Sequence, residues 1–327
     1  MKPSSINDSS SPRPAVKLWM TDFWHPATLD AIQKNPLYVL LAGHFDIELT
    51  ENPDFVIYSC FGNNHRQFDG VRIFYAGENV RPDFDECDYA FSFDFPETER
   101  NMRLPLYRLY AEYPQLLLPR RAQEVMGQKR KFCAFLNSNP RAQERIDFFD
   151  RLSAYRPVDG GGQVRNTIGY FVDDKMDFMR QYKFSIAFEN SVSPGYTTEK
   201  LMHALVADTI PIYWGNPLAH RDFNSKAFIN CHDYATFEDV VEVVKAIDQD
   251  DELYREYLNQ PFFKDGIENQ YVRKDRIIAH FSRIFANPRP KSASSVSSAF
   301  IKQINPSIQA VNRRVAQTYR QFTSFLR

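Results

Sequence analysis

The chain has 327 residues, of which 43% are hydrophobic and 25% are charged, and these proportions are typical of a globular protein long enough for two domains. Its formal net charge of −1 gives the chain no overall basic excess, so no nucleic-acid partner is expected. No apolar run reaches the roughly 18–20 residues that a membrane-spanning helix needs.

The amino terminus and the cysteines indicate the compartment. Residues 1–14 are rich in Ser and Pro, lack the apolar core of a signal peptide and are expected to be disordered. The four cysteines are scattered and form no CxxC motif. We therefore expect reduced thiols in a cytoplasmic protein.

The first half carries short β-branched and aromatic runs separated by polar residues, which predicts an α/β domain over residues 15–128. The short connections predict crossovers made of loops or very short helices. A polar, basic stretch at 120–131 predicts a connector to the next domain. The predicted strands lie in the segments 16–24, 45–49, 55–61, 71–77 and 89–95.

The second half repeats a strand–helix alternation and predicts a second domain over residues 129–288. Such alternation in both halves is typical of two Rossmann-like lobes with parallel sheets. Strands are predicted at 132–138, 183–188, 209–214 and 227–231, helices at 140–154, 173–182, 198–207, 236–247 and 277–285, and a loop at 158–166.

The tail over residues 289–327 differs in composition. After Pro290 it holds six Lys and Arg residues and no Asp or Glu, and its apolar residues from Ile308 to Leu326 recur at helical spacing. A basic amphipathic helix of this kind binds anionic membrane surfaces, which would place the protein at the inner face of the membrane. The alternative is a helix that packs on its own body or on a second copy.

The segment from Phe184 to Gly215 is the most informative part of the chain. It reads as strand, polar loop, helix and strand, with the polar residues in the turn before the helix. Open α/β sheets bind ligands at that edge, where the helix N-terminus attracts anions such as a diphosphate. Glu199 and Lys200 lie in the first helical turn and suit sugar hydroxyls and phosphate charge.

A glycine-rich loop precedes Arg165 in the sequence GGGQVRNT. Glycines at 160–162 allow close approach of a ligand to the backbone, and an arginine beside them can bind phosphate oxygens with two hydrogen bonds. The alternative is a solvated arginine on a flexible loop.

Two glutamates at strand ends are candidates for the general base. Glu78 follows the strand RIFYAG, and Glu189 follows KFSIAF. A carboxylate at either position can take a proton from an attacking hydroxyl. Taken by itself, Glu78 also fits an ordinary solvated glutamate on a loop. The sequence does not decide whether Glu78 or Glu189 is the base.

Asp22, Trp24 and His25 end the first strand and are candidates for binding an acceptor sugar through hydroxyl bonds and ring-face contact. A core tryptophan beside a satisfied aspartate is an equal alternative. The histidines are dispersed, and the DxD pairs at 83/85 and 248/250 follow no donor-site pattern. No metal cofactor is expected.

Three segments resemble the α1,3-fucosyltransferases, most closely the bacterial, Helicobacter-type members. They are FENSVSPGYTTEK with IPIYWG, GENVRPDFDECDYAFSFD, and GGGQVRNTIGY. The chain departs from the family pattern at residues 192–195. The resemblance implies a two-lobed GT-B glycosyltransferase that uses GDP-fucose. A fixed cationic set of Arg165, Lys200 and the helix N-terminus would make a bound metal unnecessary.

The same resemblance implies roles for individual residues. Glu78 falls on the base position, while Glu189 is its rival or positions the fucose ring. The donor-site positions are Arg165 and Lys200 for the diphosphate, Glu199 for the ribose, and Asn190 and Tyr196.

The implied reaction is an inverting transfer of fucose to the GlcNAc 3-hydroxyl of a galactose–GlcNAc (N-acetyllactosamine-type) glycan, which gives a Lewis-x-like product. The alternatives are a GT-B transferase for another nucleotide sugar and a non-catalytic nucleotide- or sugar-binding module.

Overall fold

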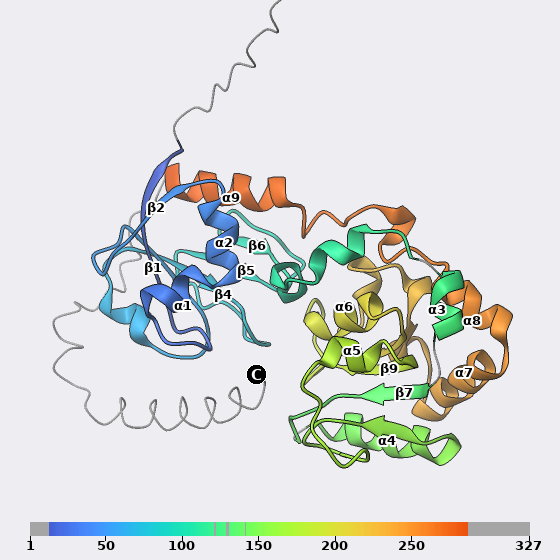
Figure 1. Ribbon diagram of the computed structural model, residues 1–327. Helices are drawn as coiled ribbons and strands as arrows, with labels where there is room; N and C mark the ends of the chain where they lie inside the picture. Colours follow the sequence, from blue (N-terminus) through green and yellow to red (C-terminus); the bar gives the residue numbers. More distant parts are fainter. Residues whose placement is uncertain (1–12, 121, 129–130, 141, 287–327) are drawn as a thin grey trace, which may run out of the picture. The chain divides into compact units, whose positions relative to one another are not determined.

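The computed structural model describes residues 13–120, 122–128, 131–140 and 142–286 (Figure 1). The predicted basic tail, and all but the end of the predicted disordered N-terminus, lie outside the described residues. Contacts group the described chain into two units. The first contains residues 13–77, 82–90 and 278–286, and the second contains residues 78–81 and 91–277.

The first sheet has the strand order β2-β1-β3-β4-β5-β6. Strand β1 pairs in parallel with β2 and β3, and β3 pairs in parallel with β4. Five strands agree with the predicted segments, while β6 was not predicted. The strands are β1 (Ala15–Thr21), β2 (Asp46–Leu49), β3 (Phe55–Tyr58), β4 (Val71–Tyr75), β5 (Tyr89–Ser92) and β6 (Asn101–Arg103).

Two short helices follow β1, as the short connections predicted: α1 (Leu29–Gln33) and α2 (Pro36–Ala42). Thr28 caps α1 by accepting from the N–H of Ala31, and Asn35 caps α2 ahead of Pro36 at its start. Both caps are sequence signals that satisfy free N–H groups at a helix start.

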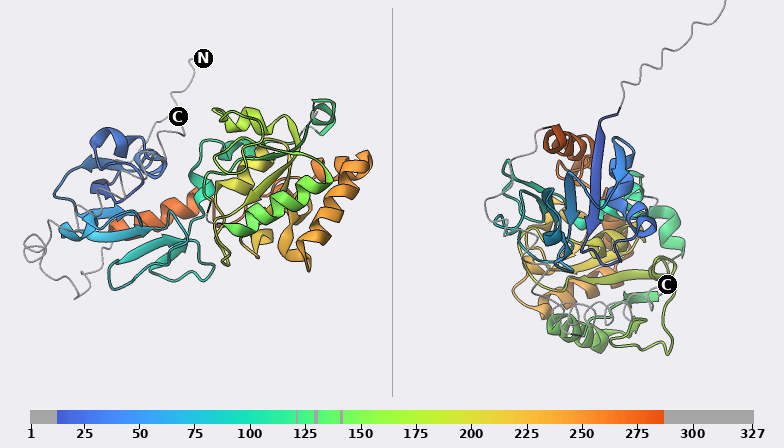
Figure 2. Two further views of the ribbon diagram at one scale, coloured as in Figure 1. Left: turned by 90° about the horizontal axis from the view of Figure 1, so that it is seen from below. Right: turned by 90° about the vertical axis from the view of Figure 1, so that its left-hand side faces the viewer.

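The helix α9 (Lys274–Ala286) contributes residues 278–286 to the first unit. The ring of Phe285 packs edge-on against Phe45 and Phe55, with centroid distances of 5.0 and 4.8 Å. Figures 1 and 2 show the helix in orange alongside the blue strands of this unit. The predicted amphipathic helix 277–285 is therefore confirmed.

The second sheet has the order β11-β10-β9-β7-β8, and all of its neighbouring strands run parallel. Its strands are β7 (Lys131–Phe135), β8 (Val158–Gly160), β9 (Tyr182–Phe188), β10 (Ile210–Trp214) and β11 (Ile229–Asn230). The accompanying helices are α3 (Ala122–Gln128), α4 (Gln143–Tyr155), α5 (Lys175–Met179), α6 (Glu199–Val206), α7 (Phe237–Gln249) and α8 (Asp251–Leu258).

Short 3₁₀ turns complete the described secondary structure. They are η1 (Asn64–Gln67), η2 (Leu106–Leu109), η3 (Tyr113–Leu117), η4 (Ala219–Arg221), η5 (Ser225–Ala227), η6 (Cys231–Asp233) and η7 (Lys264–Gly266).

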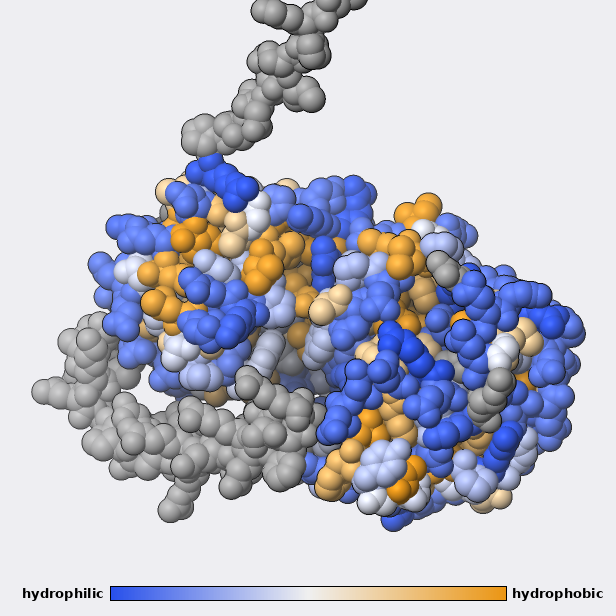
Figure 3. Space-filling model, viewed as in Figure 1, coloured by the Kyte–Doolittle hydropathy of each residue, from blue (hydrophilic) through white to orange (hydrophobic). Residues whose placement is uncertain are grey.

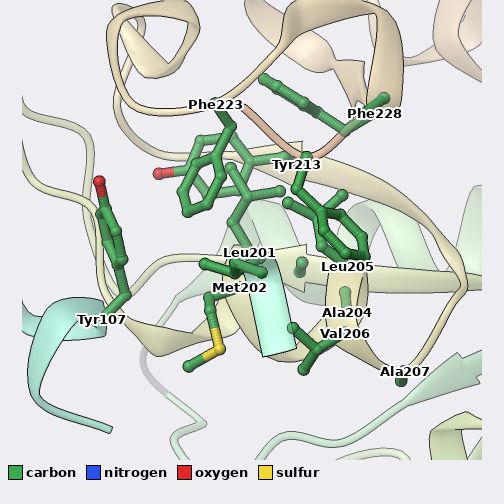
Figure 4. Close-up of a cluster of buried hydrophobic side chains, with 14 of the residues drawn as sticks. Tyr107, Leu201, Met202, Ala204, Leu205, Val206, Ala207, Tyr213, Phe223 and Phe228 are labelled. Atoms are coloured by element: carbon green, nitrogen blue, oxygen red, sulfur yellow. The ribbon is translucent and has the colours of Figure 1, made fainter. Parts of the chain in front are cut away.

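Helices cover both faces of the second sheet because successive side chains of β9 point to opposite faces. Phe184, Ile186 and Phe188 join the apolar cluster beneath α4 and α7. Ala187 belongs to the opposite cluster, which holds Leu205 and the other apolar residues of α6 (Figure 4). The central strands are buried on both sides, as parallel sheets require.

Two local predictions need correction, and one helix was not predicted. The predicted connector 120–131 contains the helix α3, because Val125 and its neighbours pack into the core. The predicted loop 158–166 begins with β8, and α8 was not predicted.

All four cysteines are thiols. Within the described part of the chain, no helix has the length and apolar character needed to cross a membrane.

On the face shown in Figure 3, apolar residues gather over the first unit, on the side where Figure 1 draws α1 and α2. Leu29 of α1 and Val39 of α2 are 53% and 58% exposed. They serve as reference positions for apolar side chains that contribute little to the core.

Truncation of the α6 core should destabilise the protein. Leu205→Ala removes a fully buried side chain and is expected to lower the free energy of unfolding by about 2–5 kcal/mol. Urea unfolding would measure the loss, with the exposed Leu29→Ala as the matched control. A loss no larger than that of the control would contradict the assignment of α6 to the core.

Candidate functional site

The turn between β9 and α6 is built around the carboxylate of Glu189. Its Oε1 accepts from the backbone N–H of Thr198 at 2.7 Å, and its Oε2 accepts from the Thr198 hydroxyl at 2.6 Å. Tyr213 and Lys200 lie at 3.5 and 3.3 Å from the same oxygens. Glu189 is fully buried, and burial raises its pKa against the opposing effect of Lys200. The carboxylate therefore fastens the end of β9 to the start of α6.

Glu199 and Lys200 lie side by side at the start of α6, and the ammonium nitrogen of Lys200 is 3.6 Å from Oε1 of Glu199. Burial works to raise the pKa of Glu199, but Lys200, Lys175 and His203 lower it to about 2. Burial also works against the Lys200 cation, but Glu199 and Glu189 outweigh it and raise its pKa. Both groups are therefore charged at neutral pH, as binding of hydroxyls and phosphate requires.

Glu78 contacts the α6 turn. Its Oε2 accepts a hydrogen bond from the Tyr196 hydroxyl at 2.9 Å, although the two residues are 118 positions apart in sequence. Burial, together with the carboxylates of Glu189 and Glu78, raises the pKa of Tyr196, so the hydroxyl keeps its proton and donates. Glu78 itself is partly exposed. The structure thus brings together five predicted site residues: Glu78, Glu189, Tyr196, Glu199 and Lys200.

A buried ion pair fixes the turn that carries Tyr196. Arg103 binds both oxygens of Asp222, at 2.7 and 2.9 Å, and neither side chain is exposed. Arg103 also donates to the carbonyl of Gly195 at 2.9 Å, and the Thr197 hydroxyl donates to Asp222 at 2.7 Å. The backbone on both sides of Tyr196 is therefore held by one ion pair.

Gly195 is required at its position for two reasons. Its φ of +91° is in the left-handed region that disfavours side chains, and a Cβ would lie 2.0 Å from the carbonyl oxygen of Phe93. Its N–H donates to Asn216 at 2.8 Å. The turn thus packs closely against the neighbouring backbone.

Arg145 is a site residue that sequence reasoning missed. Its guanidinium is buried, and it donates to the Asn137 side chain, to the carbonyl of Phe188 at 2.7 Å and to Asn190 at 3.1 Å. It thereby joins the carboxyl ends of β7 and β9 and places the predicted donor-site residue Asn190. A signal was present, because Arg145 lies on the same helical face as the buried Phe148 and Phe149.

Arg165 lies on a separate loop. It is paired with Asp150 of α4 at 2.5 Å, and its φ is +52°, a strained value for a residue with a side chain. The glycines that precede Arg165 allow segments of the protein's own backbone to approach one another closely. A Cβ at Gly160 would lie 1.8 Å from the carbonyl of Arg165, and one at Gly162 would lie 2.3 Å from that of Asn137.

The acceptor candidates Asp22, Trp24 and His25 belong to the first unit. Asp22 is buried, and its carboxylate accepts four hydrogen bonds from the backbone and side chains of Asn64 and His65, at 2.8–2.9 Å. It therefore matches the alternative of a satisfied aspartate. Trp24 is 38% exposed, and His25 lies 3.0 Å from the amide of Asn35.

The DxD pair at 248/250 has structural partners. Asp248 pairs with Lys183 and Arg156, and Asp250 caps α8. Within the described residues, no group of three or more His, Cys, Asp or Glu side chains is arranged to hold a metal ion.

Two family models match the chain. The model described as the alpha-(1,3)-fucosyltransferase FucT N-terminal domain matches residues 18–110. The model described as the C-terminal part of glycosyltransferase family 10 (fucosyltransferase) matches residues 126–269. Together they cover most of both units.

Curated relatives agree with these matches. The chain is 34% identical over 324 residues to the alpha-(1,3)-fucosyltransferase FucT of Helicobacter pylori. This match covers 85% of this chain and 67% of the relative. The chain therefore spans about two thirds of that relative's length. The chain is also 27% identical over 192 residues to alpha-(1,3)-fucosyltransferase B of Drosophila melanogaster. That match covers 52% of this chain and 43% of the relative.

Solved structures show the same likeness. A crystal structure of an α1,3-fucosyltransferase has a TM-score of 0.78 at 30% identity and covers 89% of this chain and 95% of its own. A crystal structure of an α1,3-fucosyltransferase with GDP-fucose has a TM-score of 0.75 at 31% identity, with coverage of 88% and 95%. The resemblance and the predicted α/β class of GT-B type are confirmed.

Loss of the buried ion pair should destabilise the second unit. Asp222→Ala leaves Arg103 as a buried cation without its carboxylate, and we expect a loss of about 3–5 kcal/mol in the free energy of unfolding. Glu242→Ala removes the exposed pair with Lys245 and should cost no more than about 0.5 kcal/mol. Equal losses in urea unfolding would show that the buried pair has no special role.

Proposed function

Because the chain belongs to glycosyltransferase family 10, the fucosyltransferases, we propose that it transfers fucose from GDP-fucose to a glycan acceptor. The acceptor position is the 3-hydroxyl of GlcNAc in an N-acetyllactosamine-type glycan, and the product is Lewis-x-like. One observation carries the proposal: Glu78, which matches the family's base position, contacts the turn that starts α6 with Glu199 and Lys200.

Names of similar proteins support the donor and the linkage. The Helicobacter pylori relative is named an alpha-(1,3)-fucosyltransferase, and one similar crystal structure contains GDP-fucose. The family model that matches residues 126–269 spans the turn after β9, so we assign the same donor to this site.

Donor binding uses the charged groups at the start of α6. Lys200 and Arg165 bind the diphosphate, and the ionised Glu199 accepts hydrogen bonds from the ribose hydroxyls. Arg165 now pairs with Asp150, but both partners are about half exposed, and exposed pairs are worth at most about 1 kcal/mol. A diphosphate can therefore replace Asp150 as its partner. Asn190 completes the donor site.

The reaction is a single displacement with inversion. The oxygen of the acceptor hydroxyl forms a bond to the anomeric carbon as the bond from that carbon to the phosphate oxygen breaks. The proton of the hydroxyl passes to Glu78, and GDP leaves with the electron pair. Lys200, Arg165 and the α6 N-terminus stabilise the charge that develops on the leaving phosphate.

Glu78 suits the role of base better than Glu189. Glu189 is fully buried, and protein donors surround both of its oxygens. Glu78 is partly exposed, and among the described residues Tyr196 is the side chain that donates to its carboxylate and orients it. We therefore assign Glu78 as the catalytic base and Glu189 as the residue that positions the start of α6.

Removal of the base should slow the transfer step. Glu78→Gln keeps the shape of the side chain but cannot accept a proton, so kcat should fall by about 10²–10⁴-fold. GDP-fucose affinity, measured by calorimetry, should stay within about threefold of the wild-type value. Glu242→Gln, an exposed glutamate on α7, is the matched control. Wild-type turnover by Glu78→Gln would overturn the assignment.

The assay that tests the function also tests the role of metal. With GDP-fucose, N-acetyllactosamine and EDTA, the enzyme should form fucose linked α1,3 to GlcNAc, as determined by NMR, because protein cations stabilise the leaving group. GDP-mannose and UDP-galactose should not serve as donors. Loss of activity in EDTA that Mg²⁺ or Mn²⁺ restores would refute metal independence, while transfer from another donor would refute the choice of GDP-fucose.

A further inference from the structure

A ladder of two side-chain hydrogen bonds joins two segments of the second unit that are 112 residues apart in sequence. The amide of Asn79 donates to the Ser191 hydroxyl at 2.8 Å, and the guanidinium of Arg81 donates to the Ser193 hydroxyl at 2.8 Å. Since residue 79 lies opposite 191 and residue 81 opposite 193, the register places Val80 level with Val192.

Further contacts hold the ladder in place. Arg81 forms an ion pair with Asp94 at 2.7 Å and approaches the carbonyl of Pro194 at 3.5 Å. The N–H of Val80 donates to the carbonyl of Glu78 at 2.6 Å, which turns the chain immediately after the base. Residues 78–81 consequently group with the second unit, although the chain before and after them belongs to the first.

Between these anchored positions the two valines are left exposed. Val80 is 43% exposed and Val192 is 44% exposed. Their branched side chains have few rotamers, so each presents a small, stiff apolar surface. Val80 lies two residues from Glu78 in sequence, and Val192 lies in the turn that also carries Tyr196, the hydrogen-bond donor to Glu78.

We propose that Val80 and Val192 form the acceptor subsite, with the C–H face of the acceptor sugar packed on the two valines. The inference rests on the proposed function. A base must be within about 2.6–3.2 Å of the proton that it takes, so the sugar ring that carries the reacting hydroxyl must lie beside Glu78. Both valines are exposed large apolar side chains in the segments that flank this carboxylate.

The chemistry of the ladder suits a saccharide. Ser191 and Ser193 accept hydrogen bonds from Asn79 and Arg81, and a hydroxyl that accepts can still donate its own proton. Serine hydroxyls at the rim can therefore bind sugar oxygens while the valines contact the ring carbons. This combination of an apolar floor and a few polar groups is typical of small-molecule sites.

The size of the surface favours a sugar over a protein partner. A stable protein interface buries about 800 Å² on each side, and two partly exposed side chains offer only a small part of that area. Residues 192–195 are also the place where the sequence departs from the pattern of the resembling family. A difference in acceptor choice is therefore expected to arise at this ladder.

The test compares single and double serine variants of the full chain. Val80→Ser and Val192→Ser should each raise the KM for N-acetyllactosamine about fivefold, and the double variant more than either, because apolar contact is lost. The KM for GDP-fucose and its slow hydrolysis without acceptor should not change. Val80→Ile, which keeps the apolar surface, should raise the acceptor KM less than Val80→Ser.

The matched control is Val39→Ser, an equally simple truncation of an exposed valine on α2 in the first unit, which should leave both KM values unchanged. Unaltered acceptor KM in the double variant would overturn the subsite while the proposed function stands. A parallel rise in both KM values would also overturn it, since the variants would then have distorted the donor site. Absence of fucose transfer by the wild-type enzyme would overturn the function and the subsite together.

Discussion

The ion pair between Arg103 and Asp222 is the interaction on which the donor-side turn depends. Burial of two charges is costly unless each finds enough partners, and here the pair is saturated. Arg103 also donates to the carbonyls of Phe93 and Gly195, while Asp222 accepts from Thr197 as well. These bonds can form only if the backbone around residue 196 adopts this conformation, so the pair stabilises it in the folded protein.

A second anchor acts at the end of the same turn, where Glu189 receives both the N–H and the hydroxyl of Thr198. Between the two anchors, Tyr196 has little freedom, and its hydroxyl reaches Glu78 at 2.9 Å. The carboxylate of Glu78, the proposed base, is thus oriented by a side chain that is itself held by buried charges. Because these side chains are already held in place, little entropy is lost when the Glu78 carboxylate takes up a productive geometry. Preorganisation of this kind is one way in which protein groups accelerate reactions.

The sequence predicted those parts of the fold and site that depend on local patterns. The alternation of β9, α6 and β10 was evident because their apolar runs are long and the polar residues gather in the turns. The ion pair was not predictable, since Arg103 and Asp222 are 119 residues apart and neither lies in a motif. Glu78 and Glu189 were indistinguishable as strand-end carboxylates, because their exposure depends on Tyr196 and Thr198, and only the folded chain places these partners.

The geometry of Lys200 is compatible with both its place in the fold and its proposed role in donor binding. Its ammonium lies 3.3 Å from Glu189, 3.6 Å from Glu199 and 3.0 Å from the Thr198 hydroxyl. Strong charge-assisted bonds are shorter, about 2.7–2.9 Å, so the ammonium is shared among loose contacts. Arg145, in contrast, donates at 2.7 Å to the carbonyl of Phe188 and is committed to the sheet edge. Of the two, Lys200 can therefore turn toward an arriving diphosphate without breaking the bonds that hold the turn.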